Sequence, residues 1–331
     1  MMNTAIDISD IRSGNKMAVA RGLNLLENAR PEAHGAAADL IEELSQHARE
    51  SRHVIGITGP PGVGKSTLIS RIIREYRSRG DTIGVISVDP SSKRSGGALL
   101  GDRARITYEP GDAGTFIRSM AAGGHLGGLA WRTRHCLTLF EAAFDVVVIE
   151  TVGVGQSETE IEEVVDTVVF VVQPGSGDSL QFMKAGIMEI PHILVVNKSD
   201  QEELARKAVG DLKSVGAFGS RDRCGWVPRV ITTSALNGWG QSELVSAMAD
   251  HYRFLKTGDL AGRRRQNRIF WIYLMYKERF GRFGVETLGG QARISDIIEG
   301  SDVGNPFDGL RKLTRALSDS VRLKLIEGDN P

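Results

Sequence analysis

The sequence predicts an α/β fold built on a doubly wound, mostly parallel sheet. Between residues 52 and 256, short and almost continuously apolar segments alternate with longer segments of helical periodicity. Continuous apolar strands indicate burial on both faces, and the alternation indicates parallel strands joined by crossover helices. The predicted strands cover residues 54–58, 82–88, 146–150, 167–172, 192–196 and 229–233. The predicted helices between them cover residues 65–79, 130–143, 179–190 and 241–255.

Two helical regions flank this predicted domain. Residues 1–51 are polar and Ala-rich, and apolar residues recur at helical spacing over 17–27 and 39–49, which predicts an N-terminal helical extension. Residues 257–331 are mostly helical in pattern, and the segment FWIYLMYKERF at 270–280 is apolar around much of its circumference. Two interpretations stay open for that segment: it packs on its own chain, or it forms a subunit interface as part of a dimerisation arm.

Composition limits the possible partners and locations. The chain has 331 residues with 41 basic and 41 acidic side chains, which argues against nucleic acid or an anionic membrane as a partner. Its two cysteines, Cys136 and Cys224, form no CxxC motif, and a reducing cytoplasm is the expected location. No apolar run approaches the length of about 18 residues that a membrane span requires.

A phosphate-binding loop is predicted directly after the first strand. The segment GPPGVGKST matches GxxxxGK[ST] and precedes a predicted helix, whose amino end favours an anion. Glycines can turn their amide hydrogens toward phosphate oxygens without interference from a Cβ atom. Lys65 is expected to reach the β- and γ-phosphates, and Ser66 is expected to ligate Mg²⁺. The full set of expected phosphate-site residues is Gly59, Pro61, Gly62, Val63, Gly64, Lys65, Ser66 and Thr67.

A second motif indicates guanine, so we expect GTP and GDP as the ligands. NKSD follows the strand at 192–196, and the Asp200 carboxylate can accept hydrogen bonds from guanine N1 and N2, which adenine does not offer. Lys198 can lie over the ring plane, and Asn197 can brace the loop. The segment TTSAL follows the last strand, where a backbone amide of Ser234, Ala235 or Leu236 can donate to guanine O6.

Further candidates follow the second and third predicted strands. Asp89 stands at the carboxyl end of one strand, where α/β sheets place ligands, and is expected to hold Mg²⁺ through water. ETVGVGQSE occupies the place of the DxxG motif of GTPases, with Glu150 instead of Asp. The Gly153 amide is expected to contact the γ-phosphate.

The residue that orients the attacking water does not stand at its usual position in this segment. The position after Gly153 holds the aliphatic Val154, which cannot orient water, so another side chain must make that contact. The candidates are Asp102, Gln156 and Lys184. We therefore expect slow intrinsic hydrolysis.

The combination of GPPGVGKST, DPSSKRSGGALLGD, ETVGVGQSE, GSGDSLQFMKAGI, NKSD and GDLAGRRRQNRIFW resembles the MeaB/MMAA family. These SIMIBI-class GTPases, often labelled ArgK or LAO/AO transport ATPases, act as chaperones of adenosylcobalamin-dependent acyl-CoA mutases. The resemblance covers about residues 15–280. It implies a homodimer whose GTP hydrolysis gates adenosylcobalamin delivery to the mutase and protects or reactivates that enzyme.

The resemblance also implies roles for individual residues. Phosphate and Mg²⁺ positions match Lys65, Ser66, Asp89 and Glu150. Asp102 matches the acidic position of the first switch, Gln156 lies in the second switch, and Gln181 and Lys184 match a third switch that responds to the partner. Together these matches make Ser66, Asp89, Asp102 and Glu150 the candidate metal ligands, and Lys65, Asp102, Glu150, Gln156 and Lys184 the candidate catalytic residues.

The chain departs from the family pattern in places that affect the partner. In the third switch, Ser179 and Phe182 replace the usual Glu and Gly. The partner is therefore expected to be methylmalonyl-CoA mutase or a relative such as an isobutyryl- or 2-hydroxyisobutyryl-CoA mutase.

Other functions compete with this interpretation. A nickel-insertion GTPase for hydrogenase or urease would need metal ligands, for which only His125, His135 and Cys136 are candidates. A kinase coupled to amino-acid transport and an interaction module with a degenerate nucleotide site are weaker alternatives.

Overall fold

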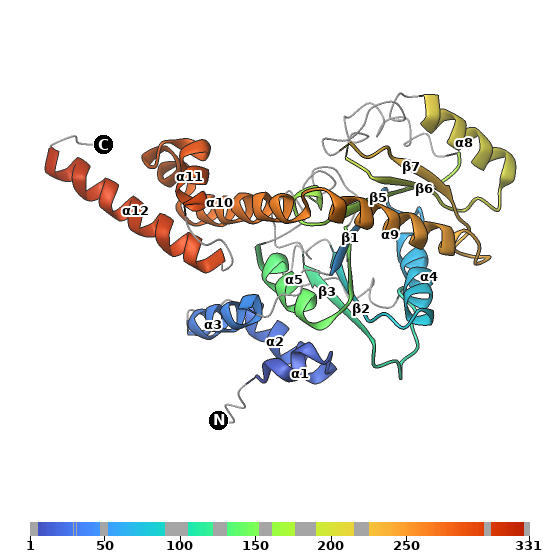
Figure 1. Ribbon diagram of the computed structural model, residues 1–331, viewed down its shortest axis with the longest axis horizontal. Coiled ribbons are helices and arrows are strands. Elements are labelled where there is room, and N and C mark those ends of the chain that lie inside the picture. Colours follow the sequence, from blue (N-terminus) through green and yellow to red (C-terminus); the bar gives the residue numbers. More distant parts are fainter. Residues whose placement is uncertain are drawn as a thin grey trace. The chain divides into compact units, whose positions relative to one another are not determined.

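The computed structural model contains one seven-stranded sheet in the order β3-β2-β4-β1-β5-β6-β7 (Figure 1). The structure describes residues 6–28, 30, 32–46, 52–89, 105–121, 131–151, 161–175, 190–214, 225–300 and 306–327. Each pair of neighbouring strands is parallel. The strands are β1 (His53–Thr58), β2 (Ile83–Asp89), β3 (Thr115–Ala121), β4 (Val146–Glu150), β5 (Thr167–Val172), β6 (Ile193–Val196) and β7 (Arg229–Thr232).

Helices cover both faces of the sheet, as the doubly wound prediction requires. On one face, α4 (Lys65–Ser78) and α9 (Gln241–Thr257) pack their apolar residues against alternate residues of the central strands. On the other face, α8 (Glu202–Ser214) packs on β5 and β6. There α5 (Trp131–Ala143) lies so close to β2 that a Cβ atom on Gly84 would stand 2.4 Å from the Phe140 ring. The short helix η1 (Ile161–Glu163) precedes β5.

The remaining helices lie before and after the sheet in the chain. They are α1 (Ile8–Arg12), α2 (Lys16–Leu26), α3 (Ala33–Gln46), α10 (Leu260–Thr287), α11 (Gly290–Glu299) and α12 (Pro306–Glu327). The chain divides into two compact units, of which the first combines residues 1–27 and 48–259. The second combines residues 28–47 and 260–331, so α3 belongs with the C-terminal helices. Among the described residues, no helix is long and apolar enough to cross a bilayer.

The six predicted strands are confirmed, but β3 and α8 lie in segments for which no element is predicted. Within the N-terminal region, α3 begins at Ala33, six residues before the predicted start. The predicted helix at 179–190 lies almost entirely outside the described residues.

Most of the apolar segment at 270–280 is already buried within one chain. Trp271, Ile272, Tyr273, Met275 and Tyr276 all have exposed fractions of 7% or less. Within the second unit, a Cβ atom on Gly309 of α12 would lie 2.8 Å from Ile272. Among its larger apolar residues, Leu274 remains exposed. The segment alone therefore gives less support to a subunit interface than its sequence suggests.

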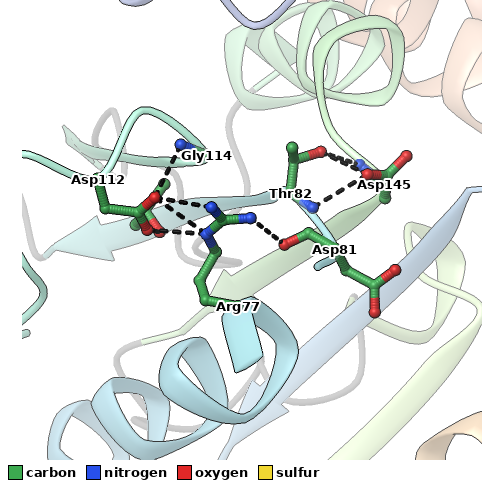
Figure 2. A network of polar contacts seen from close by, with 7 residues as sticks. Arg77, Asp81, Thr82, Asp112, Gly114 and Asp145 are labelled. Carbon is green, nitrogen blue, oxygen red and sulfur yellow. Dashed lines mark hydrogen bonds and ion pairs between the residues drawn. The ribbon is translucent and has the colours of Figure 1, made fainter. Parts of the chain in front are cut away.

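A polar network joins elements at the amino ends of β2, β3 and β4, the edge opposite to the carboxyl ends (Figure 2). Arg77 near the end of α4 donates Nε to both Asp112 carboxylate oxygens, at 3.1 and 2.8 Å, and Nη2 to one of them at 2.8 Å. Arg77 also donates Nη1 to the Asp81 carbonyl at 2.7 Å. Asp145, just before β4, accepts from the amide and hydroxyl of Thr82 at 3.0 and 2.7 Å. These bonds hold α4 and the strand starts together.

Candidate nucleotide-binding site

The loop between β1 and α4 folds around the amino end of α4. Gly64 is the residue before the helix, and no side chain caps the helix there, which leaves its first amides available to an anion. The Lys65 ammonium is buried and donates to the carbonyl oxygens of Gly59 at 2.7 Å and Pro60 at 3.1 Å. In this arrangement Lys65 is bonded to its own loop, at the place where phosphates are expected.

A carboxylate from β4 meets two serine hydroxyls beside this loop. Glu150, with an exposed fraction of 5%, ends β4. Its Oε1 accepts from Ser66 Oγ at 3.0 Å, and its Oε2 accepts from Ser87 Oγ of β2 at 3.1 Å. Three neighbouring elements, α4, β2 and β4, therefore bring oxygen ligands to one point at the carboxyl edge of the sheet.

Asn197, directly after β6, links three parts of the site. Its Nδ2 donates to the Val63 carbonyl of the phosphate loop at 2.9 Å. Its Oδ1 accepts from Thr233 Oγ1 and from the Ala235 amide, both at 3.2 Å. The phosphate loop comes so near that a Cβ atom on Gly64, whose φ is 93°, would lie 2.6 Å from Asn197 Nδ2. Glycine is required there both for the left-handed backbone and for this approach.

Lys198 has an unusual backbone conformation. Its φ is 59°, and no other non-glycine residue in the described ranges has a positive φ. Such a conformation costs about 1 kcal/mol or more and is often found at functional sites. The side chain donates to the Gly62 carbonyl at 2.8 Å and to Gln173 Oε1 at 2.6 Å. Lys198 thereby crosses from the loop after β6 to the phosphate loop and to the residue after β5.

Asp200 meets the loop that follows β7. Its Oδ1 accepts from Ser234 Oγ at 2.9 Å, while the residue as a whole is exposed. The same Ser234 Oγ accepts from the Asn237 amide at 3.2 Å, which tightens the turn around Ala235 and Leu236. Both motifs predicted to recognise guanine are thus in hydrogen-bond contact.

The structure brings together the described candidates of the phosphate and base motifs. Pro61 and Thr67 are exposed beside the buried Lys65. The backbone of Asp89 ends β2 at the same edge, but its side chain lies outside the described part of the chain. Four further candidates, Asp102, Gly153, Gln156 and Lys184, also lie outside it.

Three residues that bond to this candidate site belong to none of the motifs and are not predicted from the sequence. They are Ser87, Gln173 and Arg71, of which Arg71 donates to the carbonyls of Ala235 and Leu236. Ser87 and Gln173 lie within or directly after buried strands, and their position near a carboxyl strand end is the only signal the sequence offers. Arg71 looks like any polar residue of an amphipathic helix.

The candidate nickel ligands gain no support. His135 and Cys136 are both buried in α5, and His125 lies outside the described residues. In the ranges that the structure describes, no three His, Cys, Asp or Glu side chains are arranged to hold a metal.

A glycine-rich loop that leads from β1 into α4, at the carboxyl edge of a parallel doubly wound sheet, defines the fold of a P-loop GTPase. Residues 19–283 match the family described as methylmalonyl-CoA mutase-associated GTPase MeaB. Because this match covers more than half of the sequence, the chain belongs to the MeaB family of GTPases.

Individual relatives agree with this family. The chain is 43% identical over 267 residues to a protein of Pyrococcus horikoshii named "Putative GTPase", covering 78% of this chain and 81% of that protein. It is 33% identical over 324 residues to the GTPase ArgK of Escherichia coli, covering 94% and 95%. To the mouse protein named methylmalonic aciduria type A homolog, mitochondrial, it is 33% identical over 278 residues, covering 80% and 67%.

A solved structure has a similar fold over nearly the whole chain. The crystal structure described as a LAO/AO transport system kinase aligns with a TM-score of 0.70 and 28% identity. The alignment covers 96% of this chain and 99% of that one.

Proposed function

We propose that this GTPase gates the loading of adenosylcobalamin into an acyl-CoA mutase and protects or reactivates that enzyme. The observation that carries the proposal is the family match over residues 19–283, whose description names a mutase-associated GTPase and which includes both nucleotide motifs. The mutase is methylmalonyl-CoA mutase or a relative that acts on isobutyryl- or 2-hydroxyisobutyryl-CoA. Ser179 and Phe182, which depart from the family pattern in the third switch, favour a relative.

In this proposal GTP and GDP occupy the carboxyl edge of the sheet. The loop from Gly59 to Thr67 and the Gly153 amide surround the phosphates. Asp200, Lys198 and the amides of the loop at 234–236 contact guanine. Hydrogen bonds between the two regions, from Asn197 to Val63 and from Lys198 to Gly62, support a single continuous site.

The same residues fit a magnesium ion. Mg²⁺ prefers oxygen ligands, and the Ser66 hydroxyl and Glu150 carboxylate, 3.0 Å apart, supply such ligands beside the phosphate loop. Ser66 and Glu150 would hold the ion together with Asp89 and Asp102. Bound Mg²⁺ would neutralise charge on the β- and γ-phosphate oxygens. Ser87 holds the other carboxylate oxygen of Glu150 through its hydrogen bond to Oε2.

Lys65 tests the phosphate site. When nucleotide binds, the Lys65 ammonium must leave the carbonyls of Gly59 and Pro60 and contact phosphate instead. Lys65→Ala removes this positive charge. We expect this variant to lose micromolar GTP binding, measured by titration with a fluorescent GDP analogue and competition by GTP. Lys207→Ala, which removes an exposed lysine from α8, serves as the control. Retained micromolar affinity in Lys65→Ala would refute the phosphate-site assignment.

Two further parts of the proposal concern assembly and location. We propose a homodimer formed through the C-terminal helices, supported by the family resemblance and by the exposed Leu274 and Phe283 of α10. We propose a cytoplasmic location, supported by the low cysteine content.

The decisive experiment measures GTP hydrolysis by the purified chain with each of the three candidate mutases in turn. We expect one mutase to co-purify with the chain and to accelerate hydrolysis, and loading of adenosylcobalamin into that mutase to require GTP. If none of the three binds the chain or changes its hydrolysis rate, the chaperone role is wrong. Intrinsic GTP hydrolysis, measured without a mutase in the same series, would still show whether the chain hydrolyses GTP.

A further inference from the structure

Arg71 connects the helix that begins at the phosphate loop with the loop that follows β7. It lies six residues after Lys65 on α4. Its Nε donates to the Ala235 carbonyl at 2.8 Å and its Nη2 donates to the Leu236 carbonyl at 2.9 Å. A Cβ atom on Gly238 would lie 3.6 Å from Arg71 Nη1, so the guanidinium also lies against the far side of this turn. The planar guanidinium suits two successive carbonyl acceptors, which a lysine ammonium matches less well.

This contact determines which way one backbone amide points. The Ala235 carbonyl and the Leu236 N–H belong to the same peptide group, and no described peptide bond is cis. In a planar trans peptide these two groups point in opposite directions. While Arg71 holds the Ala235 carbonyl, the Leu236 N–H must therefore point away from the guanidinium.

The neighbouring amides of the turn already have acceptors. The Ala235 amide donates to Asn197 Oδ1, and the Asn237 amide donates to Ser234 Oγ. For the Leu236 amide, no acceptor occurs in the described part of the chain. The Leu236 side chain has an exposed fraction of 76%, so packing of that side chain does not hold the residue in place. The Gly238 amide donates to the Ser234 carbonyl at 2.8 Å and also shapes the turn. Arg71 adds direct bonds to the carbonyls of the two peptide groups on either side of the Leu236 Cα.

We propose that Arg71 is a positioning residue for guanine recognition, which orients the Leu236 amide toward O6 of the base. The inference rests on the proposed guanine site. Arg71 touches neither base nor phosphate in this assignment and acts through the peptide groups of the turn. Because it is carried by α4, it also ties the position of the base-binding turn to that of the phosphate loop.

The dissociation constants of three nucleotides distinguish this role of Arg71 from a general structural role. GDP and inosine diphosphate both carry O6, whereas the diphosphate of 2-aminopurine riboside lacks it. In Arg71→Ala we expect the dissociation constants of GDP and inosine diphosphate to rise about fivefold to tenfold, the effect of one lost hydrogen bond. The constant for the 2-aminopurine nucleotide should not change. In steady-state hydrolysis, KM for GTP should rise while kcat stays the same.

Two variants complete the design. Arg71→Lys keeps a positive charge but loses the planar pair of donors, so we expect a smaller loss confined to the same two nucleotides. Arg74→Ala removes an exposed arginine from the same helix and should bind all three nucleotides like the wild type. If Arg71→Ala does not fold, Arg71→Lys decides the question.

Equal weakening of all three nucleotides, or a fall in kcat with KM unchanged, would overturn the role of Arg71. A wild-type protein that binds GDP and the 2-aminopurine nucleotide equally would instead refute O6 recognition, and with it this part of the proposed site. The two failures are therefore distinguishable.

Discussion

At the scale of single residues, the site depends on polar side chains that are bonded on more than one side. Asn197 is the clearest case, because it contacts the phosphate loop, the residue directly after β7 and the turn that follows, while its exposed fraction is 1%. A buried amide whose partners are removed costs about 1–3 kcal/mol. The arrangement thus makes the base and phosphate regions mutually dependent before any nucleotide binds.

At the same scale of single residues, substitution of Asp200 tests the selectivity for guanine. A carboxylate accepts from guanine N1 and N2, whereas the amide of Asp200→Asn offers a donor that suits the 2-oxo group of xanthine. We expect the affinity of Asp200→Asn for GDP to fall about 100-fold, as expected for two bonds to a charged acceptor, and its affinity for xanthosine diphosphate to rise. Competition binding with both nucleotides measures this change.

Glu203→Gln supplies the matched control for Asp200→Asn, since Glu203 is an exposed acidic residue at the start of α8. Unchanged discrimination between GDP and xanthosine diphosphate in Asp200→Asn would contradict the assigned role.

At the scale of elements, the residues of the candidate site lie at the carboxyl ends of the parallel strands. The opposite edge of the sheet carries the polar network in Figure 2. Asp112 is the centre of that network. The Arg77 guanidinium, helped by bonds from Thr115 and the Gly114 amide, lowers the pKa of Asp112 from 3.8 to about 2. The Asp112 side chain is 16% exposed and the Arg77 side chain 28%, so the pair is partly shielded from solvent.

Asp112→Asn should therefore lower the free energy of unfolding at pH 7 by about 2 kcal/mol, the value of a comparable pKa difference. Because the folded state has the lower pKa, the stabilisation is complete above the ordinary pKa and disappears as pH falls through about 2. Urea unfolding at pH 7 and pH 3 should show a smaller difference between variant and wild type at pH 3. Glu109→Gln, an exposed carboxyl in the same loop, should show little effect at either pH.

The free energies of unfolding of Asp112→Asn and wild type could instead differ by the same amount at pH 7 and pH 3. The ion pair with Arg77 would then not be the source of the difference.

The strand β3 shows why some elements escape prediction. Its sequence TFIRSMA places Arg118 in the middle of the strand, which breaks the apolar pattern. In the structure the Arg118 guanidinium donates Nε to Glu27 of the N-terminal region at 3.1 Å and Nη2 to Asn24 at 3.0 Å. These partners lie more than 90 residues away in the chain, and no local pattern reveals them.

At the scale of the whole molecule, the family match extends from α2 into α10 and so includes parts of both compact units. A GTPase that reports its nucleotide to a partner needs a segment that responds to the partner separately from the chemistry. The resemblance assigns this role to the third switch, which contains Lys184.

Lys184→Ala should leave intrinsic GTP hydrolysis nearly unchanged and reduce its stimulation by the mutase. The reason is that the lysine is assigned to the partner-responsive loop and not to phosphate binding. Hydrolysis rates with and without saturating mutase measure the ratio, and Lys213→Ala on the exposed surface of α8 provides the comparison. An equal loss of both rates would make Lys184 an ordinary residue of the nucleotide site.

The sequence by itself determined the fold class, six of the seven strands, and the placement of both nucleotide motifs directly after strands. It could do so because buried parallel strands and phosphate-binding loops depend on short local patterns. Only the tertiary structure decided that Ser87, Gln173 and Arg71 bond to residues of the candidate nucleotide site, and that most of the apolar residues of α10 are buried within one chain. Those facts depend on contacts between residues distant in the chain, which local residue patterns do not encode.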